Sequence, residues 1–138
     1  MVNALREAQR VLTPSGVLIN VHPLIAPIEV AVLIATRPVW TKTLDLFSAP
    51  EDVAAADAAV QIGVSRKWLT HESSVSFDFD IYCDSAAELR VYAEARKLRG
   101  AEIPYEELEG RRRELAAGVR AARLRCRRPW KLSTYRKR

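Results

Sequence analysis

The chain has 138 residues, 49% of them hydrophobic, which is typical of a soluble globular protein with one core. Its net charge is +5, but the segment from Arg111 to Arg138 holds twelve Lys or Arg and one acid, so it carries +11 and the preceding residues carry −6. No apolar run is long enough to span a membrane, and the two distant cysteines form no metal-binding spacing. We expect one cytoplasmic domain over residues 1–138, with a basic terminal strand over 119–138 and no metal site.

The first predicted elements are a helix, a turn and an apolar strand. Apolar residues recur at helical spacing over residues 4–12, and the breakers Thr13-Pro14-Ser15-Gly16 end this helix. The run from Val17 to Val21 is nearly all apolar, which predicts a strand covered on both faces in a parallel sheet. His22 lies at the end of this strand, where open α/β sheets place ligand-contacting residues. It is therefore a candidate catalytic base or substrate contact.

Two further strands and a helix are expected next. Residues 28–40 predict two strands or a ragged hairpin, and Trp40 in the second of them is another candidate for contacting a substrate. The segment Ser48 to Asp52 is a helix start, with a serine able to cap, a proline in the first turn and two acids near the positive end of the helix dipole. The alanine-rich helix over residues 53–60 is expected to stop near Gly63 or to continue as a second short helix.

The clearest strand covers Val75 to Cys83, where apolar and polar residues alternate strictly. Its polar residues Asp78 and Asp80 predict a solvent face, or ion pairs with arginines of a neighbouring final strand, in preference to a metal or acid–base pair. The polar stretch before it, which holds His71, is expected to be an exposed loop. We expect the two cysteines to be reduced core or strand residues, with a disulfide between neighbouring strands as the alternative.

Two helices and a basic strand complete the prediction. The segment Asp84-Ser85-Ala-Ala-Glu88 forms a capping box that opens a helix whose apolar side extends to Leu98. A further helix is expected from Tyr105 to about Ala117. The chain then runs as a strand from Arg123 to Arg136, in which arginines alternate with apolar residues, as on one solvated face. The candidates for holding an anionic partner on this strand are Arg123, Arg125, Arg127, Arg128 and Lys131.

Two of these passages resemble class I S-adenosylmethionine-dependent methyltransferases. The run Arg10-Val11-Leu12-Thr13-Pro14-Ser15-Gly16 is similar to the R-V-L-x-P-G-G passage that leads into the fifth strand of their sheet, with Ser15 in place of the first glycine. A second similarity, to the end of small bacterial methyltransferases, is carried by Phe77, Phe79, Tyr82, Asp84, Ser85, Glu88, Leu89 and Tyr92. The resemblance implies an α/β fold, a partial Rossmann-like sheet of C-terminal strands with flanking helices and a last pair of antiparallel strands.

The resemblance also implies methyl transfer from S-adenosylmethionine. That cofactor needs a glycine-rich turn and an acidic strand end, which in the family lie upstream of these passages, and no G-x-G occurs in this chain. We therefore expect the C-terminal part of a methyltransferase-like protein, inactive and without cofactor alone, which supplies the sheet edge and part of the acceptor pocket. The open edge of the strand at 17–21 predicts a homodimer, a separately encoded N-terminal half as partner, or a truncated gene model.

A second hypothesis is a non-catalytic binding or regulatory module whose basic terminal strand holds an anionic partner. Nucleic acid is one such partner, because Trp130 and Tyr135 lie among the arginines, but the alternating arginines favour a solvated strand face. A methyltransferase half should gain S-adenosylmethionine binding only when a G-x-G segment is supplied, whereas a binding module should hold an anion alone and lose it with salt. A degenerate fragment without function is the third possibility, and the sequence does not identify a methyl acceptor.

Overall fold

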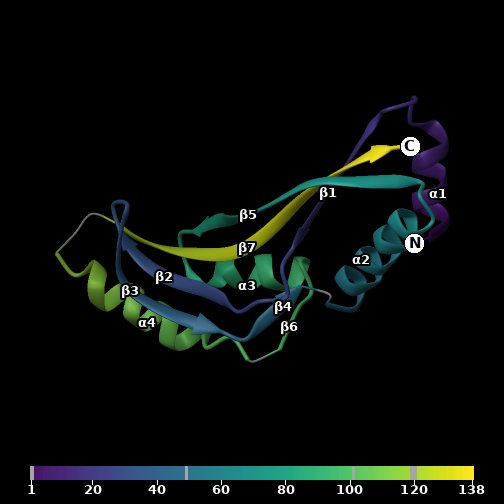
Figure 1. The fold of residues 1–138 in the computed structure, drawn as a ribbon. Coiled ribbons are helices and arrows are strands. Elements are labelled where there is room, and N and C mark those ends of the chain that lie inside the picture. Colours follow the sequence, from purple (N-terminus) through teal and green to yellow (C-terminus); the bar gives the residue numbers. More distant parts are fainter. Residues whose placement is uncertain (1, 49, 101, 119–120) are drawn as a thin grey trace. The chain divides into compact units, whose positions relative to one another are not determined.

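A computed structural model describes residues 2–48, 50–100, 102–118 and 121–138 and shows an α/β protein with four helices and a mostly antiparallel sheet (Figure 1). The chain divides into two compact units, to both of which strands β5 (Leu69–Cys83) and β7 (Ala122–Lys137) contribute. The single domain expected over residues 1–138 remains a prediction, although the chain divides into these two compact units. Residues 119 and 120 of the predicted terminal strand lie outside the described residues. The described residues of unit 1 belong to Met1–Leu24, Pro50–Phe77 and Trp130–Arg138, and those of unit 2 to Ile25–Ala49 and Asp78–Pro129.

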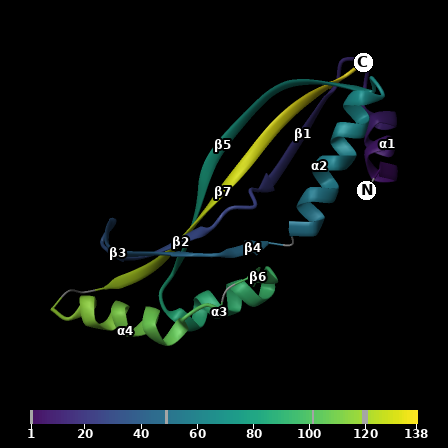
Figure 2. The same ribbon diagram turned by 60° about the horizontal axis from the view of Figure 1, so that its bottom comes forward.

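Unit 1 packs two helices against strands. Helices α1 (Val2–Val11) and α2 (Pro50–Ser65) lie side by side, and strand β1 (Val17–Pro23) pairs antiparallel with the last part of β7 (Figure 2). The core of this unit joins one residue from each helix to residues of β5 and β7, and Leu18 of β1 packs against it. Burying each such side chain contributes about 1.5–3 kcal/mol. The buried members of this core are Leu5, Val60, Leu69 and Tyr135.

The structure corrects the expectation that the first strand is covered on both faces in a parallel sheet. β1 is antiparallel to β7, and the exposed fractions of Val17, Ile19 and Val21 are 41%, 59% and 45%. Leu18 and His22, on the other face of β1, are covered. The described helices of unit 1 pack on that second face alone, so apolar residues at alternate positions remain in solvent.

Unit 2 places two helices on strands β2 (Ile28–Ile34), β3 (Arg37–Leu44) and β7. β2 and β3 form the antiparallel hairpin that the sequence predicted, and β2 also pairs antiparallel with β7. The short strands β4 (Leu46–Ser48) and β6 (Leu98–Gly100) pair with each other. Helices α3 (Ala86–Ala95) and α4 (Tyr105–Ala116) cover the core. Its central residues include Val30, Val32, Leu89, Leu108, Leu124 and Cys126.

Helix α2 begins as predicted and ends close to the stop expected near Gly63. It starts at Pro50 with Glu51 and Asp52 in its first turn, while the side chain of Ser48 lies outside the description. The helix runs through Gly63 and ends at Ser65, two residues beyond the stop expected near Gly63, and residues 66–69 do not form the alternative second helix. Gly63 instead permits close packing, because a Cβ atom there would lie 2.9 Å from Cδ2 of Leu5.

Strand β5 is longer than the sequence indicated, and this overturns the loop assignment of His71. The strand begins at Leu69, and His71 is an exposed strand residue. Hydroxyl pairs hold this polar part of β5 to β7, since Ser73 Oγ lies 2.8 Å from Thr134 Oγ1 and Ser74 Oγ lies 2.8 Å from Ser133 Oγ. Polar side chains therefore stabilise a strand that apolar periodicity did not detect.

A second correction concerns Leu98, which was expected on the apolar side of the third helix. α3 ends before it, and Lys97 adopts a positive φ of 50°, a conformation that interrupts a right-handed helix. Leu98 then begins β6 and pairs with Ser48 of β4. It still packs against the core of unit 2.

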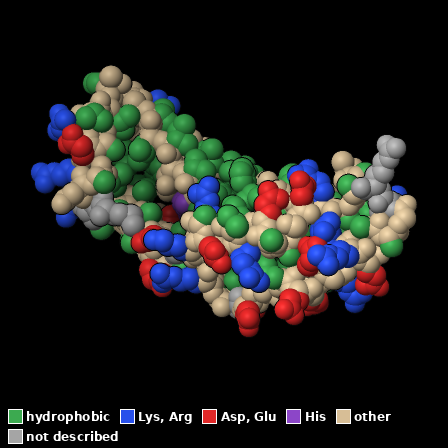
Figure 3. All heavy atoms as spheres, turned by 180° about the vertical axis from the view of Figure 1, so that it is seen from behind, with side chains coloured by type: hydrophobic (Ala, Val, Ile, Leu, Met, Phe, Trp, Pro, Cys, Tyr) green, Lys and Arg blue, Asp and Glu red, His purple; other side chains and the backbone are tan. Residues whose placement is uncertain are grey.

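Ion pairs join β5 to β7, as the sequence predicted for its aspartates. Asp80 Oδ1 lies 2.7 Å from Arg127 Nε, and Asp84, just beyond β5, accepts a hydrogen bond of 2.6 Å from Arg123. The Arg127 guanidinium is also the main reason that the pKa of Asp80 is lowered. On the face shown in Figure 3, acidic and basic side chains are interspersed.

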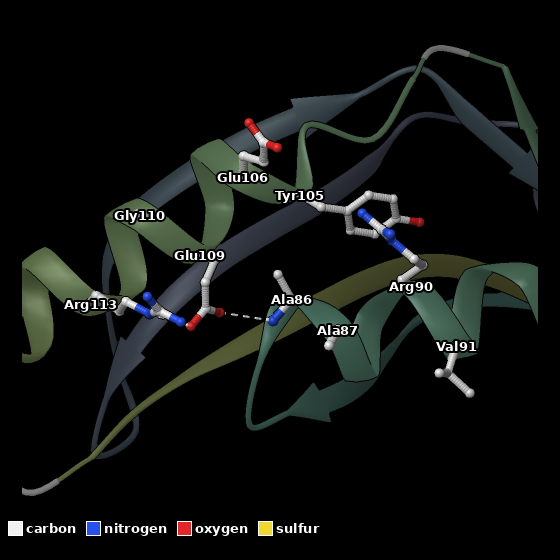
Figure 4. Close-up of a pocket in the computed structure, with 9 residues that line it drawn as sticks. All are labelled: Ala86, Ala87, Arg90, Val91, Tyr105, Glu106, Glu109, Gly110 and Arg113. Atoms are coloured by element: carbon white, nitrogen blue, oxygen red, sulfur yellow. Dashed lines mark hydrogen bonds and ion pairs between the residues drawn. The ribbon is translucent and has the colours of Figure 1, made fainter.

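The N-terminus of α3 is held by two carboxylates. The capping box is confirmed, because Ser85 Oγ accepts from the backbone N–H of Glu88, and Glu88 accepts from that of Asp84. Glu109 of α4 accepts from the backbone N–H of Ala86 at 3.0 Å (Figure 4). Hydrogen bonds from Arg112, this backbone amide and Arg113 lower the pKa of Glu109 from 4.5 to about 2. Glu109 thus ties α4 to the start of α3.

Replacing this carboxylate should make stability depend less on pH. Because the pKa of Glu109 is lowered by folding, its contribution is complete above about pH 4.5 and is lost as the pH falls to about 2. We expect Glu109→Gln to lower the free energy of unfolding by about 1–2 kcal/mol at pH 6 and by much less at pH 2.5. Urea denaturation at both pH values measures this, with the exposed Glu106→Gln as control. An equal loss at both pH values would contradict the assignment.

Both cysteines are free and buried in the core of unit 2, so the reduced-core prediction is confirmed and the disulfide alternative is wrong. Burial raises the pKa of Cys83 and raises that of Cys126 to about 11. Since the thiolate is the reactive form, we expect neither thiol to react quickly with an aromatic disulfide reagent at pH 8 in the folded protein. Both should react at once in guanidinium chloride. Fast reaction of the folded protein would show that the core opens.

Candidate functional site

His22 is the centre of the candidate site, which lies wholly in unit 1. It ends β1, and its side chain is 91% buried, with Nε2 3.1 Å from Oδ1 of Asp57 on α2. Nδ1 lies 3.0 Å from the carbonyl oxygen of Pro23, which can only accept, so Nδ1 is the donor. Nε2 makes no aligned hydrogen bond among the described residues. This nitrogen is therefore the one that can take up or release a proton beside a carboxylate.

A row of polar side chains continues from His22 across the strands. Asn20 lies opposite Ser133 of β7, and Ser133 in turn bonds Ser74 of β5. The Nδ2 atom of Asn20 is buried and has no hydrogen-bond partner among the described residues. Lys131 lies opposite His22, is half-buried and forms no ion pair within the part of the chain that the structure describes. His22 and Asp57 thus meet where β1 contacts α2, with Asn20 on the same face of β1 and Lys131 opposite His22 on β7.

An apolar hollow adjoins this polar row. Its volume is about 240 Å³, and it lies between the two helices of unit 1 and β1. Asn20 lines it, together with Leu18, Ile19 and small residues of both helices, and no lining residue is charged. The hollow is open because four of its lining residues are alanines, and larger side chains at those positions would fill it. The alanines are Ala4, Ala8, Ala56 and Ala59.

The other predicted site residues fall outside this cluster. Trp40 lies on β3 and packs against the core of unit 2. Arg123, Arg125 and Arg127 form ion pairs with Asp84, Glu29 and Asp80. Arg128 is buried and donates to the hydroxyl of Tyr92 at 3.0 Å. Of the five predicted anion-binding residues, only Lys131 has neither an ion pair nor a side-chain hydrogen bond to another described residue, so the proposal of an anion-binding strand gains no support from the geometry.

A larger groove of about 630 Å³ lies between α3 and α4 (Figure 4). Several of its polar side chains already have partners within the chain, although the exposed Glu106 also lines it. The Arg90 guanidinium lies 4.6 Å from the centre of the Tyr105 ring, and Glu109 is bonded to Arg113 and to the backbone of Ala86. The groove therefore combines small apolar side chains with polar groups of which several are used inside the chain, and we do not assign it a function.

No family model, curated protein or solved structure matches this chain. Among the described residues, no three His, Cys, Asp or Glu side chains are grouped so that they could hold a metal ion. None of the described helices is long and apolar enough to cross a membrane. The site must therefore be interpreted from its own chemistry.

Sequence reasoning identified His22 and Lys131 but missed Asp57 and Asn20. Asp57 is the one acid within an otherwise apolar stretch of α2, from Val53 to Val60, and this isolation was the available signal. Asn20 interrupts an apolar strand in the same way. Neither signal specified a partner, because the contact between β1 and α2 depends on how distant segments pack.

Replacing the buried Asn20 amide should stabilise the protein. A buried donor without a partner costs about 1–3 kcal/mol, and leucine has the same branched shape without that polar group. We expect Asn20→Leu to raise the free energy of unfolding by about 1 kcal/mol in urea denaturation. Asn3→Leu on the exposed face of α1 is the control and should change it little. A loss of stability in Asn20→Leu would show that the amide has a partner in solution.

Proposed function

We propose that this chain is the C-terminal, acceptor-side part of a class I S-adenosylmethionine-dependent methyltransferase-like protein, whose sheet is completed at the free edge of β1. The observation that carries the proposal is the position of this strand. β1 pairs with β7 along one edge, and within the described residues its other edge has no strand partner. Its backbone donors and acceptors on that edge can therefore receive a further strand.

The composition of β1 supports a covered edge. Edge strands that face solvent are usually protected by charged residues, prolines or bulges. The segment Val17–Pro23 has no charged residue, its register with β7 is continuous, and its proline is the last residue. Three exposed apolar side chains, Val17, Ile19 and Val21, would gain cover from an added layer.

The neighbouring strands and His22 also fit the proposal. The resemblance implies a final antiparallel strand pair, and the contacts between β5 and β7 run in opposite directions along the two strands, from Asp84–Arg123 to Ser73–Thr134. His22 lies at the carboxyl end of β1, where a sheet of this class places ligand contacts. In this proposal His22 Nε2 accepts the proton that the methyl acceptor loses, and Asp57 stabilises the resulting cation.

S-adenosylmethionine would supply the methyl group, but the residues present do not fit it by themselves. The chain has no G-x-G turn, and the described residues offer no acidic strand end beside β1. The cofactor site therefore belongs, in this proposal, to the segment that completes the sheet. That segment is carried either on a longer form of this chain or on a separate one.

Translating the genomic DNA upstream of the Met1 codon tests the proposal. We expect a strand, a glycine-rich turn and a second strand ending in an acid, in frame or in an adjacent reading frame. Calorimetry should then detect S-adenosylmethionine binding to the joined protein but not to residues 1–138 alone. Changing the glycines of that turn to valine is the control and should abolish binding. Unrelated upstream sequence, or a joined protein that binds no cofactor, would overturn the proposal.

A further inference from the structure

We infer that the hollow between α1, β1 and α2 binds a small, uncharged and largely apolar molecule that carries one hydrogen-bonding group. The inference that this molecule is the methyl acceptor rests on the proposed function. The inference that it binds in the hollow does not. The hollow is built from residues of unit 1 alone, so binding requires no other segment of the sheet.

The lining determines the class of ligand. Apolar side chains from three elements form the walls, and a charged group placed there would lose its hydration without gaining a counter-charge from the lining. The volume of about 240 Å³ lies below the range of drug-sized pockets and fits a single substituted ring or a short branched chain. An uncharged molecule of that size fills the space that the alanines leave.

One polar group at the hollow lacks a partner. Asn20 lines the hollow, and its buried Nδ2 donor has no acceptor among the described residues. A hydroxyl or carbonyl oxygen on the ligand would provide that acceptor after rotation of the amide about χ2. Sites that hold one polar group in apolar surroundings orient their ligand by that bond, which is the usual arrangement in small-molecule pockets. His22, two residues along the same face of β1, then lies near the end of the ligand that Asn20 holds.

The test uses residues 1–138 and the probe 4-ethylphenol, with 4-ethylbenzoate as its charged counterpart. In a titration followed by ¹H–¹⁵N NMR, we expect saturable shifts of the backbone amides of Ala8, Ala56 and Ala59 and of the side-chain amide of Asn20. The benzoate should bind at least tenfold more weakly. Failure of 4-ethylphenol to saturate these shifts, or equal binding of the benzoate, would overturn the inference.

Variants then locate the site. Ala56→Leu fills the hollow from α2 and should abolish the shifts, while Ala55→Leu, an exposed neighbour on the same helix, should leave them unchanged. Ala8→Leu fills the hollow from α1 and serves if Ala56→Leu does not fold. Asn20→Leu should weaken binding at least tenfold although it stabilises the fold. Binding that persists in a folded Ala56→Leu or Ala8→Leu protein contradicts the inference. These binding measurements do not depend on whether a cofactor-binding segment exists.

Discussion

The structure depends on the pairing of β7 with its neighbours. β7 pairs with β1, β2 and β5, so of the pairings in the main sheet only the β2–β3 hairpin forms without it. The same strand supplies Tyr135 to the core of unit 1 and Leu124 and Cys126 to that of unit 2. A change that removed β7 would therefore take these side chains from both cores and leave β1 and β5 without a strand partner.

This role explains why the most basic segment of the chain is not a free cationic surface. A strand that lies between others must have its charges compensated, and the arginines of β7 meet acids contributed by β5 and β2. Cross-strand pairs of this kind contribute a few tenths of a kcal/mol each when exposed, and they fix the register more than they add stability. Part of the basic excess after residue 110 is thus paired with acids of the preceding residues on neighbouring strands.

Local signals in the sequence predicted local structure well. The capping box at Ser85, the start of α2 and the β2–β3 hairpin depend on neighbouring residues, and all three are present. The environment of β1 could not be predicted, because a nearly all-apolar run fits a strand covered on both faces and also one whose second face is exposed. The candidate site shows the same difference between local signals and the packing of distant segments. The position of His22 at the end of β1 followed from the local sequence, whereas its contact with Asp57 depends on the packing of α2 against β1.

The position of β7 along the chain sets the order of events during synthesis. Its sixteen residues, Ala122–Lys137, leave the ribosome after the other strands that the structure describes, and contacts of such long sequence separation form slowly. Until then β1 and β5 have no partner in the sheet, and their apolar residues are open to other chains. We expect a nascent chain that waits for its central strand to need a chaperone more than its modest size suggests.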